Sequence, residues 1–299
     1  MTDKEEPADL DGDLVDGDDE PDPEALAEQA QALADEDLED EDDEEGEDEG
    51  GDRELGGDGA PQAARTAKDQ DAPGPDVPAP PLSELRAALE WAFANEGVSP
   101  ELLDRYARHA RMLLDHNRQV NLTAILDPRE VAAKHYLDSW RLTQLLSFMG
   151  KRVVDLGSGG GFPGLPLAMV EPHASVVLVE SSQKKAAFLQ HCVDELEVAN
   201  CTVFAGRCED YLIQERCDLV LVRAVSSVRE NVRTLRKVRH SLKDMLMLKG
   251  ASWSREVRAG EREVERLGFH LDTVWEHDLP EEMGHRAILI YRAPGGQGL

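Results

Sequence analysis

Between residues 151 and 293, short apolar runs alternate with stretches of helical period, and this alternation constrains the fold more than any other feature of the sequence. The expected strands are 152–156, 175–180, 201–205, 218–224, 244–249, 270–276 and 286–293. The expected helices between them include 182–196, 226–240 and 253–267. This alternation is typical of an open, mostly parallel sheet that is covered on both faces. Because no long crossover separates the last two runs, we expect an α/β fold with a seven-stranded sheet whose last strand is antiparallel.

A small helical module precedes this region. Helical periodicity covers 82–97, 99–119 and 127–146. Ser99 followed by Pro100 is a typical helix start. Asp127, Pro128 and Glu130 form a second start, which resembles a capping box. We therefore expect three helices ahead of the sheet.

The first 80 residues carry nearly all of the charge. They hold 32 acidic and 4 basic residues, a net charge of −28, whereas the whole chain has a formal net charge of −30. Such a segment cannot bury enough apolar surface to offset the entropy of ordering, so we expect a disordered acidic extension. The expected parts of the chain are a tail over 1–80, a helical module over 81–150, a sheet domain over 151–293 and a flexible C-terminus over 294–299.

Targeting and cysteine patterns exclude several classes of protein. The four cysteines, at 192, 201, 208 and 217, lack the close pairing that a zinc site or a disulfide framework needs. The sequence contains no secretory signal pattern and no apolar run of membrane length. We therefore expect a cytoplasmic protein with reduced thiols, no membrane partner and no bound metal.

A glycine-rich turn follows the first expected strand, in the stretch VVDLGSGGGFPGLPL at 153–167. The first turn after a strand is where open α/β sheets bind ligands. A P-loop needs Lys and then Ser or Thr after the last glycine, but Leu and Pro follow here, which excludes that class. Gly159, Gly161 and Gly164 match a dinucleotide-binding pattern, although two prolines delay the helix that would receive a pyrophosphate.

A second register of the same turn places Asp155 before Gly157, Gly159 and Gly161. The carboxylate would repel a pyrophosphate and attract a ligand with positive charge, such as S-adenosylmethionine. Glu180, at the end of the second expected strand, suits the ribose hydroxyls of either kind of ligand. The residues therefore favour S-adenosylmethionine as the cofactor and leave a nicotinamide-dependent oxidoreductase as the alternative.

Five stretches resemble a known family in their order and spacing. They are NLTAILDPREVAAKHYLDSW, VVDLGSGGGFPGLPLA, LVESSQKKAAFLQ, GRCED and DLVLVRAV, and the likeness covers roughly residues 84–293. The chain resembles the GidB family, the ribosomal RNA small subunit methyltransferases G. The resemblance implies a Rossmann-like methyltransferase fold and S-adenosylmethionine-dependent methylation of guanine N7 in the 530 loop of 16S rRNA. A methyltransferase of the same fold with another substrate remains the alternative, and the acidic tail is not part of the family pattern.

The resemblance also implies cofactor contacts and a partner. The family's cofactor contacts fall on Gly157, Phe162, Cys208, Glu209 and Arg223. The implied partner is 16S rRNA, either free, within the 30S subunit or within an assembly intermediate. We expect the protein to act on it as a monomer.

Guanine N7 carries a lone pair at neutral pH, so this reaction needs no general base and no metal. Orientation of the reacting atoms would then supply most of the catalysis. We expect Arg223, at the end of the fourth strand, to hold the cofactor or the base, with a salt bridge to a rim carboxylate such as Glu209 as its structural alternative. His135 and Asp138 lie at i and i+3 on one helix face and are the other candidate catalytic residues. Their spacing also fits a hydrogen bond in helix packing.

Basic side chains are candidates for contacts with RNA phosphates. Several of them cluster within 233–240, where an ordinary solvated helix face is the alternative explanation. The candidate RNA-binding residues are Lys134, Lys184, Lys185, Arg233, Arg236, Lys237 and Arg239. Aromatic residues are too sparse for a base-stacking platform, so we expect the shape of the RNA to be recognised.

Overall fold

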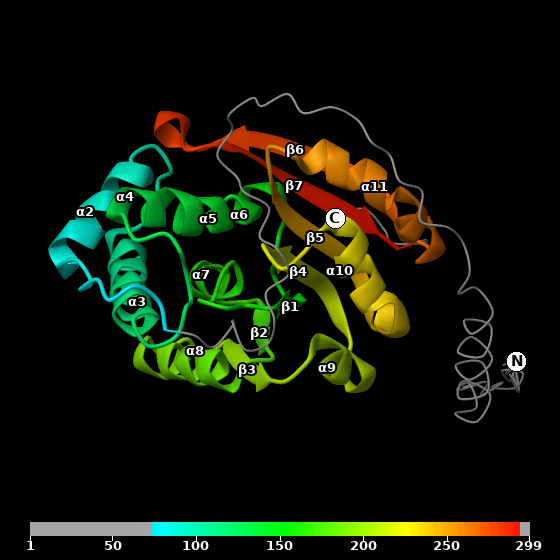
Figure 1. Cartoon of the computed structure of the whole chain (residues 1–299), viewed down its shortest axis with the longest axis horizontal. Coiled ribbons are helices and arrows are strands. Elements are labelled where there is room, and N and C mark those ends of the chain that lie inside the picture. Colours follow the sequence, from blue (N-terminus) through cyan, green and yellow to red (C-terminus); the bar gives the residue numbers. More distant parts are fainter. Residues whose placement is uncertain (1–72, 294–299) are drawn as a thin grey trace, which may run out of the picture. The chain divides into compact units, whose positions relative to one another are not determined.

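In a computed structural model of the chain, residues 73–293 are described, and all of them belong to one compact unit. At its centre lies a seven-stranded sheet with the strand order β3-β2-β1-β4-β5-β7-β6 (Figure 1). The strands are β1 (Arg152–Leu156), β2 (Ser175–Glu180), β3 (Cys201–Ala205), β4 (Cys217–Arg223), β5 (Leu242–Gly250), β6 (His270–Asp278) and β7 (His285–Arg292). Strand β7 runs antiparallel to β5 and β6, and the remaining pairs are parallel. The predicted α/β fold and the antiparallel last strand are confirmed.

Helices cover both faces of this sheet (Figure 1). The α-helices are α2 (Leu82–Ala92), α3 (Pro100–Asn117), α4 (Pro128–Val131), α5 (Asp138–Trp140), α6 (Leu142–Leu145), α7 (Gly164–Val170), α8 (Gln183–Glu195), α9 (Cys208–Gln214), α10 (Val228–Leu235) and α11 (Trp253–Arg266). Successive strand residues such as Val153 and Val154 enter opposite apolar clusters. One cluster joins the sheet to α2, α3, α7 and α8, and the other joins it to α9, α10 and α11.

The helical module shares its core with the sheet. The Arg105 guanidinium donates to the carbonyl oxygens of Met169 (3.3 Å) and Leu196 (3.2 Å). The Tyr106 hydroxyl donates to the Pro166 carbonyl oxygen (3.1 Å). Apolar residues of the module and of the sheet also form one continuous cluster. Residue 150 is therefore not a boundary between two cores.

The helix starts follow local sequence chemistry. The Ser99 side chain accepts a hydrogen bond from the Leu102 amide, and Asp127 accepts from the amides of Arg129 and Glu130. The helix expected over 127–146 is instead divided into α4, a π-helical segment η2 (Ala132–Leu137), α5 and α6. No helix within residues 73–293 is long and apolar enough to cross a membrane. The four cysteines are buried and free.

Residues 73–80 pack against α3, so assigning them to a disordered tail was wrong. The Gly74 amide donates to the Asn117 carbonyl oxygen (3.0 Å), and the Arg111 guanidinium donates to the carbonyl oxygens of Ala79 (3.2 Å) and Pro80 (2.7 Å). A proline-rich segment loses little backbone freedom on ordering, and its carbonyls remain available as acceptors, which explains why it docks. The rest of the expected tail lies outside the described residues, as does the expected flexible C-terminus 294–299.

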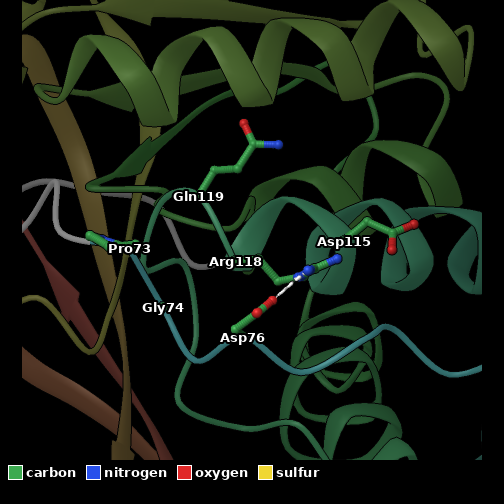
Figure 2. Close-up of a pocket in the computed structure, with 6 residues that line it drawn as sticks. All are labelled: Pro73, Gly74, Asp76, Asp115, Arg118 and Gln119. Carbon is green, nitrogen blue, oxygen red and sulfur yellow. Dashed lines mark hydrogen bonds and ion pairs between the residues drawn. The ribbon is translucent and has the colours of Figure 1, made fainter.

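A pocket lies between this segment and the end of α3, and Figure 2 shows the ion pair of Asp76 with Arg118 at its edge. The pocket is lined by Pro73, Gly74, Asp76, Asp115, Arg118 and Gln119. None of the residues predicted for the functional site lines it. The pocket therefore belongs to the contact between the proline-rich segment and α3.

Close packing at the start of α7 gives a test of the core. A Cβ atom on Gly164 would lie 2.5 Å from Leu178 Cδ2 and 2.7 Å from Asp155 Cβ. We expect Gly164→Ala to lower the free energy of unfolding by about 1–3 kcal/mol, because this core cannot absorb the extra methyl group. Urea denaturation measures the change.

Gly250→Ala is the matched control, because a Cβ atom there meets no atom within 4 Å. Its unfolding midpoint should stay close to that of the unmodified protein. Equal midpoints for Gly164→Ala and Gly250→Ala would contradict the packing argument.

Candidate active site

The carboxyl ends of four parallel strands, β1 to β4, meet at one edge of the sheet. This edge carries the glycine turn after β1, Glu180 at the end of β2, the segment 206–209 after β3 and Arg223 at the end of β4. The sheet topology thus brings together the four segments that the sequence predicts to bind a ligand.

The glycine turn is built from left-handed backbone. Gly157, Gly159 and Gly161 have φ angles of 66°, 55° and 98°, a region that side chains disfavour. Ala224, with a φ of 53°, turns the chain sharply after β4 and brings Val225 next to the turn. A Cβ atom on Gly157 would lie 2.9 Å from Val225 Cγ2, so bare backbone is required there.

Glu180 ties the glycine turn to β2. One carboxylate oxygen accepts from the Gly159 amide (3.0 Å) and the other accepts from the Ser182 amide (2.9 Å). A carboxylate oxygen can accept more than one hydrogen bond, so both oxygens keep acceptor capacity. The group can therefore hold the turn and bind hydroxyl groups of a ligand at the same time.

Asp155 lies deeper than the sequence suggests. Its side chain is fully buried, and Oδ2 accepts from the Gly164 amide (3.0 Å) at the start of α7. Oδ1 has no hydrogen-bond partner among the described residues. Burial raises the pKa of this carboxyl from 3.8 to about 6, against the opposing effects of the Gly164 amide and the Arg223 charge.

The other residues predicted to bind a cofactor divide into two groups. Gly161, Phe162 and Cys208 are buried and take part in packing, whereas Gly157 is exposed and Glu209 is half-buried. Glu209 lies 3.6 Å from the Arg207 guanidinium and forms no ion pair with Arg223. Of the structural alternative for Arg223, a salt bridge to a rim carboxylate, the example Glu209 is therefore wrong, and the carboxylate near Arg223 is that of Asp138.

Arg223 instead contacts the helical module. Its guanidinium donates to the Lys134 carbonyl oxygen (2.9 Å) and to His135 Nδ1 (3.2 Å), and it lies 4.0 Å from Asp138 Oδ2. The same group lies 4.9 Å from the centre of the Phe162 ring. Burial lowers the pKa of Arg223, and the Asp138 and Asp155 carboxylates oppose this shift. The structure thus brings the three candidate catalytic residues together.

His135 is held in one tautomer. Because a guanidinium only donates, Nδ1 is the accepting nitrogen and Nε2 carries the proton, which it donates to Thr123 Oγ1 (2.9 Å). Burial and the positive charge of Arg223 lower the pKa of His135 well below its usual range. The imidazole is therefore neutral, and its lone pair is occupied by Arg223.

Two further contacts hold this cluster, and sequence reasoning missed both. The Asn117 side chain accepts from the amides of Leu122 (2.7 Å) and Thr123 (2.9 Å), which fixes the loop that presents Thr123 to His135. The π-helical turn at 132–137 exposes the Lys134 carbonyl to Arg223. Such turns are frequent at functional sites, but their local sequence is ordinary helix.

His277 is a further residue of the site that the sequence did not indicate. Its Nε2 lies 3.3 Å from Asp138 Oδ1, and its ring stacks on Trp275 with centroids 4.7 Å apart. It comes from β6, and the segment that follows β6 reaches α4, where Glu281 pairs with Arg129 (3.2 Å). Nothing in the sequence near His277 indicates that β6 would reach Asp138, which lies far earlier in the chain. Only the strand order brings the two residues together.

The candidate RNA-binding residues lie at two separate edges. Lys184 and Lys185 are at the start of α8, next to the carboxyl end of β2, and Lys134 pairs with Glu130 (2.8 Å) beside Arg223. The segment 233–240 runs toward the opposite edge, because β5 then begins at Leu242, paired with the first residue of β4.

Residues of that segment also have structural partners. Arg233 pairs with Glu263 (3.1 Å), and the Arg239 Nε donates to the Leu267 carbonyl oxygen (2.7 Å). Arg236 and Lys237 are exposed. The structure therefore does not place Arg233, Arg236, Lys237 and Arg239 at the active site.

The arrangement suits a nucleoside ligand with positive charge. Bare backbone at Gly157 and Gly159, acceptor capacity on Glu180 and the unpartnered Asp155 Oδ1 fit the polar groups of S-adenosylmethionine. Within residues 73–293 no group of three His, Cys, Asp or Glu side chains has metal-binding geometry. The residues around Arg223 offer orientation and charge, and the lone pair of His135 is occupied.

The buried Asp155 makes stability depend on pH. Its folded-state pKa, about 6, lies above the value of 3.8 for an exposed carboxyl, so the folded protein keeps this proton longer as the pH rises. The contribution of the protonated Asp155 to the stability of the folded state is fully present below about pH 4 and is lost as the pH rises through 6. We expect Asp155→Asn to remove this loss, which amounts to about 3 kcal/mol.

Free energies of unfolding at pH 4 to 8 measure the effect for both proteins. The difference between the two curves isolates Asp155, because the other titrating groups are shared. Parallel curves would contradict the raised pKa.

Comparisons with known proteins identify the family of this chain. The family model for GidB, rRNA small subunit methyltransferase G, matches residues 102–282. Ribosomal RNA small subunit methyltransferase G of Solibacter usitatus is 38% identical over 190 residues, which is 62% of this chain and 88% of that protein. The protein of the same name from Carboxydothermus hydrogenoformans is 31% identical over 214 residues, 70% of this chain and 91% of that protein.

Among solved structures, a putative RNA methyltransferase from Pyrococcus horikoshii is 20% identical, covers 56% of this chain and 86% of its own, and has a TM-score of 0.40. The family match carries the assignment, because it spans in one range the helical module from residue 102 onward, the glycine turn, Arg223 and His277. The chain belongs to the GidB family of rRNA small subunit methyltransferases G and is a methyltransferase.

Proposed function

We propose that this protein transfers a methyl group from S-adenosylmethionine to N7 of a guanine in the 530 loop of 16S rRNA. The observation that carries the proposal is the fixed Arg223–His135 pair beside the glycine turn. The pair presents a cation and a neutral imidazole whose lone pair is taken, so His135 has no capacity to remove a proton. Guanine N7 attacks through an existing lone pair and needs no such base, unlike an amino or hydroxyl group.

The chain's own residues account for binding and orientation. The cofactor supplies an electrophilic methyl group on a sulfonium centre. Glu180 would hold the ribose hydroxyls of the cofactor, and the backbone at Gly157 and Gly159 would lie against it. The half-buried Glu209 would lie beside the adenine ring. Arg223 can donate to guanine O6, next to N7. Asp138 and Asp155 balance the positive charge of donor and product.

Membership of the family supports rRNA as the substrate. The relatives are named as methyltransferases of small-subunit rRNA, and we extend this substrate to the present chain. We infer that it acts in the cytoplasm, as a monomer, on 16S rRNA that is free, within the 30S subunit or within an assembly intermediate.

The test is methyl transfer from labelled S-adenosylmethionine to 30S subunits and to free 16S rRNA that lack the modification. Cleavage at N7-methylguanine by borohydride and aniline then locates the product. We expect one modified guanine in the 530 loop. Transfer only to a small molecule or a protein, or binding of NAD without S-adenosylmethionine, would overturn the proposal.

Arg223 should be needed for the chemical step. We expect Arg223→Ala to lower kcat about 100-fold, because an oriented donor at the reacting base is lost. Arg152→Ala is the control, since Arg152 pairs with Glu215 at the start of β1, the opposite edge of the sheet. Single-turnover rates with saturating rRNA measure both variants. A normal rate for folded Arg223→Ala would remove Arg223 from the mechanism.

His277 acts as a positioning residue through Asp138. We expect His277→Ala to lower kcat about 10-fold with little change in either KM, because the Asp138 carboxylate loses its neighbour and Arg223 shifts. His277→Gln, which keeps a donor, should restore most of the rate. Equal losses in the Ala and Gln variants would indicate a purely structural role.

A further inference from the structure

Helix α11 carries four arginines on one face. Arg255, Arg258, Arg262 and Arg266 are spaced three, four and four residues apart, and all four are exposed. At 100° per residue this spacing keeps them within one stripe. The buried residues of the helix, Gly260 and Val264, lie on the opposite side. We call these four residues the α11 stripe.

Among the residues that the structure describes, the α11 stripe has no acidic partner. Within residues 73–293, none of its four guanidinium groups lies in an ion pair or a side-chain hydrogen bond, whereas the neighbouring Arg229 and Arg233 of α10 both approach Glu263. Glu256 of the same helix is taken by Lys249 (2.8 Å). Helix α11 holds four glutamates as well as four arginines, but Glu256 and Glu263 pair with basic residues of other elements, so the exposed side of the helix sets four arginines against Glu261 and Glu265. The four arginines are available to an anionic partner.

The α11 stripe starts at the edge of the active site. Helix α11 follows β5, whose Leu248 pairs with Arg223, so its first turn lies at the edge that carries Arg223. From there it runs beside α10 toward the opposite edge (Figure 1). Eleven residues separate Arg255 from Arg266, which gives the stripe a length of about 17 Å. A strand whose target base lies at Arg223 could continue along this helix.

We propose that the α11 stripe binds backbone phosphates of the rRNA substrate outside the target nucleotide. The inference rests on the proposed function for the identity of the RNA. Guanidinium groups match phosphate oxygens in pairs, and a row of them follows a strand without selecting its bases. The stripe therefore sets the affinity for RNA, while Arg223 and its partners act on the target base.

The test replaces all four arginines by glutamine, which has a similar helix propensity and should leave α11 folded. We measure binding to a 16S rRNA transcript at several salt concentrations, and KM and kcat for methylation of the same RNA. We expect KM to rise at least 10-fold with kcat unchanged. The slope of log affinity against log salt should become shallower by roughly three, since each phosphate contact contributes about 0.7–0.9.

A control of opposite sign lies on the same helix. The double variant Glu261→Gln, Glu265→Gln removes two exposed acids that flank the α11 stripe, and it should tighten RNA binding. An unchanged slope and KM in the folded quadruple variant would overturn the inference. So would a KM that rises for 30S particles alone with unchanged binding to the free transcript, because the partner would then be a protein. If no methylation of rRNA occurs with the unmodified protein, the proposed function fails, and the binding slopes still decide about the stripe.

Discussion

The Arg223 guanidinium is the interaction on which the rest of the site depends. Burying a guanidinium costs free energy unless its N–H groups find acceptors and its charge finds an opposite charge. The Lys134 carbonyl and His135 Nδ1 supply acceptors, and Asp138 supplies the opposite charge. All three belong to the helical module, whereas Arg223 ends a strand of the sheet. The sheet is therefore complete as an active site only with the module packed against it.

The shared core explains how this alignment is kept. Hydrogen bonds from α3 to α7 and to the end of α8 lock the module onto the sheet, and a continuous apolar cluster fills the space between them. Asn117 at the end of α3 then fixes Thr123, and Thr123 fixes the ring of His135. Packing far from the ligand edge thus fixes the orientation of a histidine ring at that edge.

Periodicity and helix starts predicted the fold well, because they are local. Each of the seven expected strands is present, and the caps at Ser99 and Asp127 form as expected. The glycine turn and Arg223 were also found, since parallel strands deliver their ends to one edge. Long-range pairings had no such signal. The approach of β6, which places His277 against Asp138, depends on strand order, and the direction of α10 decided that the basic segment 233–240 lies away from the site.

Charge at the ligand edge suits the proposed methyl transfer, a reaction that moves positive charge without creating it. A sulfonium donor and an N7-methylated guanine each carry one positive charge, so an ion pair formed or broken during transfer would only add to the barrier. The carboxylates of Asp138, Asp155 and Glu180 are all buried, those of Asp155 and Glu180 accept hydrogen bonds from backbone amides, and Arg223 is held by the module. A fixed set of charges around a neutral His135 needs no reorganisation as the methyl group moves, which is the main way such a site can accelerate transfer.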